Sequence, residues 1–486
     1  MTTLVETVVT AHTPETLVDR LRGEPGLVLL RSNGFEHPQA RYSFLAARPF
    51  LSLRSSGSRC ELASPTGPSQ VWFGNPWRLL ESLLARFELP DEVDLPFPLG
   101  GAFGFWGYNL RRFVEPRLGP GPADDLELPD SCIGFHDSLV VFDHHTRSVR
   151  IVATGLRRDG SRDLDAARCA AGYWRDHLVS EPADTATTVR LSTFPATSPT
   201  SNFTREWFCD AVRRAQKLIR SGDIYQVNLA QRLSAACPEP PWEFFQRLAA
   251  VSSAPFTAFL DAGDFQLASV SPELFLKISG HHVLTRPIKG TRPRSSDPNT
   301  DAQLTYELQT SGKELAELLM ITDLLRNDLG RICEFGSIRV PDLMRLEKFP
   351  QVQHLVSTVE GRLRAGLTHA AALESCFPGG SITGAPKIRA MEIIDQLEPV
   401  ARGPYTGCAG YLGFNRESQL SILIRTAVLR EGQAWYHAGA GIVADSDPDA
   451  EFDETLAKAS GFTAALSEIA RTQFHPTAST PTHAPR

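Results

Sequence analysis

A segment poor in large apolar side chains divides this chain of 486 residues into two parts. Residues 181–203 consist largely of Ser, Thr, Pro and Ala, a composition that breaks helix and strand periodicity and buries little surface. The sequence therefore predicts an N-terminal lobe over 1–180, a linker over 181–203 and a second domain over 204–468. Residues 469–486 contain three prolines and few apolar side chains, so we expect a flexible tail there.

Both parts combine strand and helix patterns, which favours an α+β fold. Short apolar runs broken by Gly and Pro dominate the first part. In the second part, Thr204 has the position of a helix N-cap, and the helix is expected to end near Ser221. The following segment, IYQVNLAQRL, alternates apolar side chains with Gln226 and Asn228. This polar strand face either lines a cavity or faces solvent.

Charge and cysteine content exclude several classes of function. The formal net charge is -7 without long runs of like charge, so no nucleic-acid partner is expected. No apolar run is long enough to span a membrane, and the N-terminus lacks the pattern of a signal peptide. The eight cysteines are too widely spaced for a CxxC zinc pair or a dense disulfide framework, which favours a reducing compartment and a cytoplasmic location.

The segment RPIKGTRPR, residues 286–294, is the densest positive cluster. A loop made rigid by Pro and Gly that presents Lys289 beside other cations suits an anionic substrate, and those cations lower the pKa of the lysine toward nucleophilic use. An exposed basic turn is the alternative. Glu273 begins an apolar run upstream; near an apolar wall its carboxyl would stay protonated as a general acid, whereas at an exposed strand end it would not.

Two ExxE pairs offer carboxylates for a metal ion. Glu314 and Glu317 lie in one predicted helix, and Glu451 and Glu454 lie in another that Pro448 opens, so each pair shares a helix face. If the two helices face each other, four converging carboxylates would require a hard divalent cation such as Mg²⁺. For each pair alone, a solvated helix face is the more common explanation, and spacing alone does not show that the two pairs form one site.

Two glycine-rich stretches resemble nucleotide-binding motifs but do not match the full patterns of those motifs. PGGSITGAPK, residues 378–387, lacks the lysine that a phosphate loop needs after Gly384. Gly439 and Gly441 match GxGxxA, but ADSDPD follows where a dinucleotide-binding helix would already have begun. The sequence therefore excludes an ATPase and a dinucleotide site. Both stretches can still hold carboxylates through backbone N–H groups.

Two further polar side chains lie in apolar strand patterns. His354 is either a pocket residue or a structural histidine. Arg425 lies in SILIRTAVL, and a buried arginine needs an anion, which is either a protein carboxylate or a substrate carboxylate.

Several of these segments follow one another in a characteristic order. Along 204–468 the chain reads GDIYQVNLAQR, SPELF, PIKGT, DLLRNDLGRI, HLVSTVEG, GGSITGAPK and GAGIVADSDPDAEFDET. This string resembles the chorismate-using enzymes, which include the anthranilate, aminodeoxychorismate, isochorismate and salicylate synthases. PFPLGGAFGFWGYNLRRFVEP in the first part is similar to the N-terminal region of the aminating members. The resemblance implies two stacked, largely antiparallel β-sheets flanked by helices, as in anthranilate synthase component I.

The resemblance also implies a role for each candidate residue. Glu273 would be the general acid for the leaving 4-hydroxyl group of chorismate. The Mg²⁺ that receives the ring carboxylate would be surrounded by Glu314, Glu317, Glu451 and Glu454. The enolpyruvyl carboxylate would lie against Tyr405, Arg425, Gly439 and Gly441. The remaining substrate-binding positions would be Gly290, Thr291, His354 and Ser381.

Two positions distinguish the branches of this family. Isochorismate and salicylate synthases carry a lysine base where this chain has Gln226, and an amide cannot activate water. Anthranilate synthases read PIAGT where this chain reads PIKGT, so Lys289 matches the aminodeoxychorismate synthases, in which it would be a covalent nucleophile.

The resemblance therefore implies synthesis of 4-amino-4-deoxychorismate from chorismate and ammonia, on the route to 4-aminobenzoate and folate. Ammonia would come from glutamine through a separate glutamine amidotransferase subunit. The alternatives are an anthranilate synthase component I and a catalytically idle regulatory member of the family.

Overall fold

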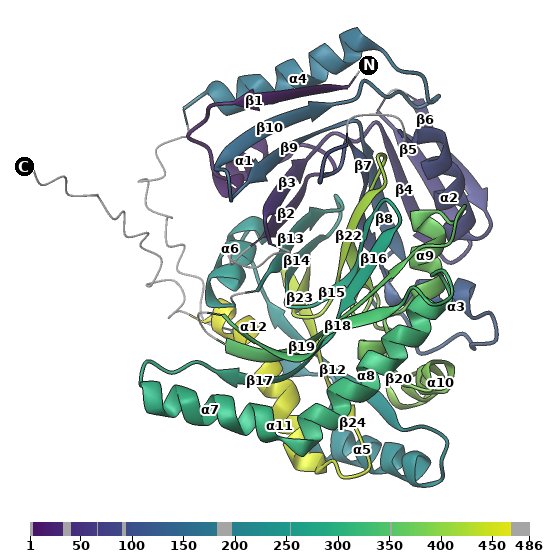
Figure 1. The fold of residues 1–486 in the computed structure, drawn as a ribbon, viewed down its shortest axis with the longest axis vertical. Helices are drawn as coiled ribbons and strands as arrows, with labels where there is room; N and C mark the ends of the chain where they lie inside the picture. The colour runs from purple at the N-terminus through teal and green to yellow at the C-terminus, as the bar shows by residue number, and fades with distance from the viewer. Residues whose placement is uncertain are drawn as a thin grey trace, which may run out of the picture.

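The structure is a computed structural model that describes residues 3–32, 40–65, 67–89, 94–181, 197–252, 254–349 and 352–467. The predicted tail and most of the predicted linker, residues 182–196, lie outside the described residues. Two 12-stranded β-sheets dominate the fold, and helices surround them (Figure 1). The predicted α+β fold of two largely antiparallel sheets is confirmed.

The first sheet joins strands from both sides of the predicted linker. Its strand order is β1 (Leu4–Val8), β10 (Ser148–Ala153), β9 (Ser138–Asp143), β3 (Tyr42–Ala46), β2 (Val28–Ser32), β13 (Phe256–Asp261), β14 (Gln266–Ser271), β23 (Thr426–Arg430), β24 (Gln433–Ile442), β12 (Gln226–Ala236) and β11 (Thr200–Ser201), with β20 (Gly384–Ala385) paired to β12. The pair β2 and β13 joins the two parts of the chain in antiparallel register.

The second sheet is built in the same way. Its strand order is β17 (Ile288–Pro293), β19 (Val352–Arg362), β16 (His282–Arg286), β15 (Leu274–Ser279), β22 (Glu417–Ile422), β21 (Cys408–Gly413), β7 (Gly101–Trp106), β8 (Ser131–His136), β4 (Leu51–Ser56), β5 (Arg59–Ser64) and β6 (Gly67–Phe73), with β18 (Arg339–Lys348) paired to β19. Here β7 and β21 join the two parts.

Apolar side chains from both sheets form the core between them. Phe44 of β3 packs against Tyr411 of β21 with ring centroids 5.1 Å apart, and Leu267 of β14 belongs to the same buried cluster. These strands have apolar side chains on the face that meets the other sheet, as the alternation of a pleated strand requires. The stacked arrangement therefore depends on residues from both parts of the chain.

Helices cover the outer faces and the end of the sheets that holds the site. The first sheet buries apolar side chains of α1 (Pro14–Leu21), α4 (Leu164–Val179), α6 (Pro241–Val251) and α12 (Ser460–Leu466). The second sheet buries those of α2 (Pro76–Phe87) and α9 (His369–Cys376). Around β12 and β24 lie α5 (Arg205–Arg220), α10 (Lys387–Leu397) and α11 (Pro448–Lys458). The other helical segments are η1 (Tyr108–Leu110), α3 (Arg111–Val114), α7 (Pro298–Thr310), α8 (Gly312–Gly330) and η2 (Gly380–Ile382).

Local sequence signals set the ends of the helices near the site. The Thr204 side chain accepts a hydrogen bond from the backbone N–H of Trp207, so Thr204 is the N-cap of α5 as predicted, and Ser221 is its C-cap. Such a cap contributes about 1 kcal/mol to helix stability. Pro448 is the first residue of α11, and Asp447 caps it. Within the described residues, no helix is long and apolar enough to cross a membrane.

Candidate active site

A cavity of about 310 Å³ lies between the ends of the two sheets and the helices α8 and α11. Of the predicted site residues, only Glu451 does not line it. The predicted residues that do line it are Glu273, Lys289, Gly290, Thr291, Glu314, Glu317, His354, Ser381, Tyr405, Arg425, Gly439, Gly441 and Glu454. Residues from distant parts of the sequence therefore share one cavity, although their chemical roles remain predictions.

Two glycines of β24 form part of the cavity wall. A Cβ atom on Gly439 would lie 2.6 Å from Asn228 Oδ1, and one on Gly441 would lie 2.3 Å from Gln226 Nε2 and 2.8 Å from Glu317 Oε1. Any side chain at these positions would therefore clash with groups around the cavity. Both glycines lie within a strand rather than in a turn before a helix, which agrees with the exclusion of a dinucleotide site.

The polar face of β12 lies toward the cavity. Asn228 lines it, and Gln226 Nε2 donates a 2.6 Å hydrogen bond to Glu317 Oε1. Of the two possibilities for this strand face, the structure therefore supports the cavity.

Glu273 is buried at the cavity wall, with 6% of its surface exposed. Burial raises its pKa to about 7, although the hydrogen bond from Ser381 and the charge of Lys289 act in the opposite direction. Ser381 Oγ donates that hydrogen bond to Glu273 Oε1 over 2.5 Å. The alternative of an exposed strand-end glutamate is wrong, and a substantial protonated fraction is available for acid catalysis near neutral pH.

Lys289 points into the cavity and pairs with Glu317. The distance between Lys289 Nζ and Glu317 Oε1 is 2.6 Å, and 16% of the lysine side chain is exposed. Burial lowers the pKa of Lys289, but the charge of Glu317 and the hydrogen bond to it outweigh this effect and raise the pKa. The prediction that neighbouring cations lower this pKa is therefore wrong.

The cations around Lys289 are occupied by carboxylates of their own. Arg286 pairs with Glu347, and Arg294 Nε lies 2.8 Å from Asp301 Oδ1. Their charges are therefore compensated locally, while Glu317 compensates the charge of Lys289. The alternative of an exposed basic turn does not describe Lys289, because only 16% of its side chain is exposed.

Thr291, His354 and Arg425 provide polar groups around the cavity. Thr291 Oγ1 and His354 Nδ1 are hydrogen bonded over 2.9 Å. Burial, followed by the positive charge of Arg425, lowers the pKa of His354 to about 4, so its imidazole is neutral at physiological pH. No described carboxylate forms a salt bridge with Arg425, which leaves its charge available for an anion in the cavity.

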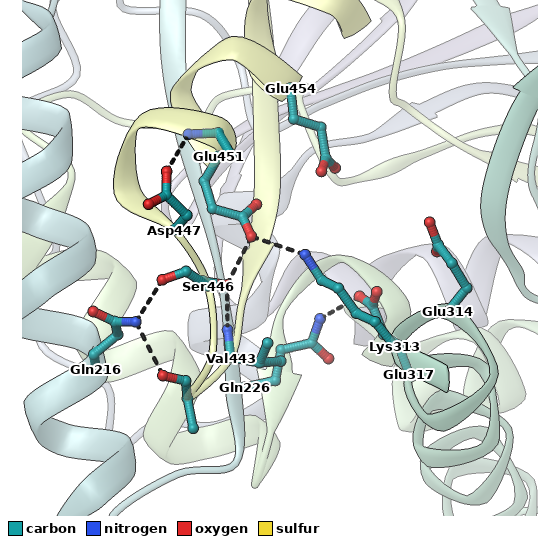
Figure 2. A network of polar contacts seen from close by, with 12 residues as sticks. Gln216, Gln226, Lys313, Glu314, Glu317, Val443, Ser446, Asp447, Glu451 and Glu454 are labelled. Carbon is teal, nitrogen blue, oxygen red and sulfur yellow. Dashed lines mark hydrogen bonds and ion pairs between the residues drawn. The ribbon is translucent and has the colours of Figure 1, made fainter. Parts of the chain in front are cut away.

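The four glutamates predicted to bind metal come from two helices that face each other. Figure 2 shows Glu314 and Glu317 on α8 and Glu451 and Glu454 on α11. Each carboxylate is paired with a cation. The pairs and their N–O distances are Glu314 with Arg292 (3.5 Å), Glu317 with Lys289 (2.6 Å), Glu451 with Lys313 (3.1 Å) and Glu454 with Lys458 (2.7 Å).

The chemistry of these donors fits a hard divalent cation. Carboxylate oxygens are the preferred protein ligands of Mg²⁺, and the buried Oε2 of Glu451 has no hydrogen-bond partner. Among the described residues, however, no three acidic, histidine or cysteine side chains already form a group that could hold a metal ion. The donors fit Mg²⁺, but their present partners are lysines and an arginine.

Two lysines that contact these carboxylates were not predicted from the sequence. Lys458 follows Glu454 by one helical turn, and this i,i+4 spacing could have predicted the ion pair. Lys313 pairs with Glu451 across two helices, for which no local sequence signal exists. His437 was also missed; it lines the cavity and stacks on Tyr405 with ring centroids 5.0 Å apart.

Comparison with known proteins identifies the family of this chain. Residues 36–464 match the model of the chorismate binding enzyme family. The chain belongs to this family.

The most similar relatives include two kinds of component 1. The chain is 41% identical over 436 residues to aminodeoxychorismate synthase component 1 of Salmonella typhimurium, covering 89% of this chain and 91% of that protein. It is 36% identical over 462 residues to anthranilate synthase component 1 of Acetivibrio thermocellus, covering 94% and 93%. The crystal structure of anthranilate synthase component I from Streptococcus pneumoniae superposes with a TM-score of 0.76 at 33% identity, covering 88% of this chain and 93% of that chain. The predicted resemblance of the fold to anthranilate synthase component I is thus confirmed.

Proposed function

We propose that this chorismate-converting enzyme is an aminodeoxychorismate synthase component I, which forms 4-amino-4-deoxychorismate from chorismate and ammonia. The observation that carries the proposal is the position of Lys289: the lysine that distinguishes this branch from the anthranilate synthases lies in the cavity, which Glu273 also lines. The relatives named aminodeoxychorismate synthase component 1 support it. Product analysis is necessary because anthranilate synthases are similarly close relatives of this chain.

The cavity offers separate positions for the two carboxylates of chorismate. Arg425, Tyr405 and the backbone at Gly439 and Gly441 would bind the enolpyruvyl carboxylate, since Arg425 is a cation without a described carboxylate partner. The hydrogen-bonded Thr291 and His354 would lie along the ring. Mg²⁺ would be held by Glu314, Glu317, Glu451 and Glu454 and, when bound, would supply positive charge for the ring carboxylate.

Lys289 and Glu273 would divide the chemistry between a nucleophile and an acid. The ammonium group of Lys289, whose pKa is raised, first loses a proton to solvent. The free amine then forms a bond to C2, the ring double bonds shift, and the C4–O bond breaks. Glu273 gives its proton to the departing oxygen, which leaves as water. Ammonia then forms a bond to C4, the C2–N bond to Lys289 breaks, and the surplus proton of the new amine returns to Glu273. The enolpyruvyl group is retained, so the product is 4-amino-4-deoxychorismate.

The ammonia would be produced from glutamine by a separate amidotransferase subunit. The names of the relatives, component 1, imply a second component in those proteins. For this chain we propose a partner of the same kind and the route to 4-aminobenzoate and folate. Ammonium salts should replace the partner in vitro, because the proposed chemistry uses only ammonia at the cavity.

Product analysis tests the proposal directly. Purified protein is incubated with chorismate, Mg²⁺ and ammonium at mildly alkaline pH, and the products are identified by mass spectrometry. We expect an aminated product that keeps its enolpyruvyl group. Formation of anthranilate and pyruvate would instead assign the chain to the anthranilate synthases, and absence of chorismate consumption would indicate a catalytically idle member.

Replacement of Arg425 should weaken substrate binding more than it slows the chemical step. A hydrogen bond to a charged group contributes about 1.5–3 kcal/mol, so Arg425→Gln should raise KM for chorismate by about ten- to a hundredfold with a smaller change in kcat. Steady-state kinetics measure both parameters. Arg364→Gln, on a residue that does not line the cavity, is the control. A large fall in kcat at unchanged KM would contradict a role in ground-state binding.

A further inference from the structure

The carboxylates around the cavity are neutralised one by one by cationic side chains. Four glutamates of α8 and α11 face four cations, namely Arg292, Lys289, Lys313 and Lys458. A group of carboxylates meant for a divalent cation needs such compensation when the metal is absent, because unpaired buried charge is costly. Each metal ligand must therefore exchange a protein cation for the metal.

Glu451 shows most clearly what this exchange requires. Only 2% of its side chain is exposed, and its Oε1 accepts hydrogen bonds from Ser446 Oγ over 2.7 Å and Lys313 Nζ over 3.1 Å (Figure 2). Its Oε2 is buried without a hydrogen-bond partner. Lys313 is thus the cation that compensates a carboxylate with an unused oxygen.

Among the three lysines of the site, Lys313 is best placed to leave its carboxylate. Its side chain is 54% exposed, whereas that of Lys289 is 16% exposed. Lys458 Nζ also donates a 2.9 Å hydrogen bond to the carbonyl oxygen of Gly439. Lys313 has no second hydrogen-bond acceptor among the described residues, so it can move into solvent with the loss of one contact.

We propose that Lys313 takes the place of the divalent cation on Glu451 in the metal-free protein and competes with it. This inference rests on the proposed magnesium site. An ammonium group and a divalent cation cannot share Glu451 without strong mutual repulsion, so Lys313 withdraws when the metal binds. Lys313 thereby compensates the charge of Glu451 in the metal-free protein and lowers the affinity of the site for the metal.

Calorimetric titration of the full chain with Mg²⁺, without substrate, tests the inference. Lys313→Gln removes the competing charge and should bind Mg²⁺ about fivefold more tightly than the wild type, which corresponds to the upper range of a partly exposed ion pair. Lys313→Arg keeps the charge and should bind Mg²⁺ no more tightly than the wild type. Lys348→Gln is the matched control, because Lys348 also pairs with one carboxylate, at 3.3 Å from Asp301, but does not line the cavity.

The outcomes separate this inference from the proposed function. Unchanged or weaker Mg²⁺ binding by Lys313→Gln, or equal tightening by Lys313→Arg or Lys348→Gln, would overturn it. If neither the wild type nor any variant binds Mg²⁺, both the inference and the magnesium site are overturned. Lys313→Arg retains the charge, so any tightening of Mg²⁺ binding by this variant would overturn the inference even if Lys313→Gln folds poorly. Product analysis needs none of these titrations, so it tests the choice of branch independently.

Discussion

Replacing Lys289 with arginine is expected to lower the rate of chorismate amination by about a thousandfold or more, with the fold retained. A guanidinium group stays protonated at any accessible pH and cannot act as the nucleophile, and removal of a catalytic nucleophile costs several orders of magnitude in rate. Arginine can still pair with Glu317, so the buried carboxylate keeps a counter-ion. Mass spectrometry of the product and a thermal unfolding curve provide the two measurements.

A second substitution separates loss of the nucleophile from loss of the ion pair. Lys289→Met should be equally inactive but also less stable, by about 3–5 kcal/mol, because Glu317 is left without its closest cation. Lys458→Arg serves as a control that alters another lysine of the same cavity while keeping its charge. Substantial amination by Lys289→Arg would show that the lysine acts by its charge and not by forming a bond to C2.

Replacing Glu273 with glutamine is expected to lower turnover by about a hundredfold or more. Loss of one preorganised group that stabilises the transition state costs about 2.7–4 kcal/mol, and an amide cannot supply the proton that the departing 4-hydroxyl group needs. The pKa of Glu273 is raised to about 7 by burial. Above about pH 7 the loss of the acid form of Glu273 is offset by the growing fraction of free Lys289 amine, because the pKa of Lys289 is raised. With the concentration of free ammonia held constant, wild-type turnover should therefore rise up to about pH 7 and level off above it.

The pH profile also distinguishes a direct role of Glu273 from a structural one. Glu273→Gln should not level off near pH 7, and its residual rate should keep rising with pH. Ser381 donates a hydrogen bond that lowers the pKa of Glu273, so Ser381→Ala should shift the levelling of the rate to higher pH. Glu417 is a suitable control, since burial also raises its pKa and Ser279 also donates to it, but it does not line the cavity. A levelling of the rate near pH 7 that persists in Glu273→Gln would assign it to another group.

Sequence patterns predicted local structure near the site better than they predicted electrostatics. The cap at Thr204 and the start of α11 at Pro448 depend on neighbouring residues and could be predicted from them. The partners of Lys289 and Glu451 come from distant segments, so their ion pairs became visible only in the fold. For the same reason, the spacing within each ExxE pair could not predict that the two pairs lie in one site. Only the resemblance to a family predicted this.

The strand order could not be predicted either. The composition of 181–203 indicated a boundary, but composition does not specify which strands pair across it. The structure places β2 beside β13 and β7 beside β21. Register between strands that are far apart in sequence depends on the packing of both faces, which a pattern within one segment does not contain.

This interleaving of strands limits how such a chain can evolve and be engineered. If either part were replaced by an unrelated domain, β13 and β21, or β2 and β7, would each lose a neighbour. The unpaired N–H and C=O groups of such strands are templates for aggregation. The first part is therefore not an exchangeable module, despite the compositional boundary. Recombination between relatives should succeed only when both strands of each pair, β2 with β13 and β7 with β21, are inherited together.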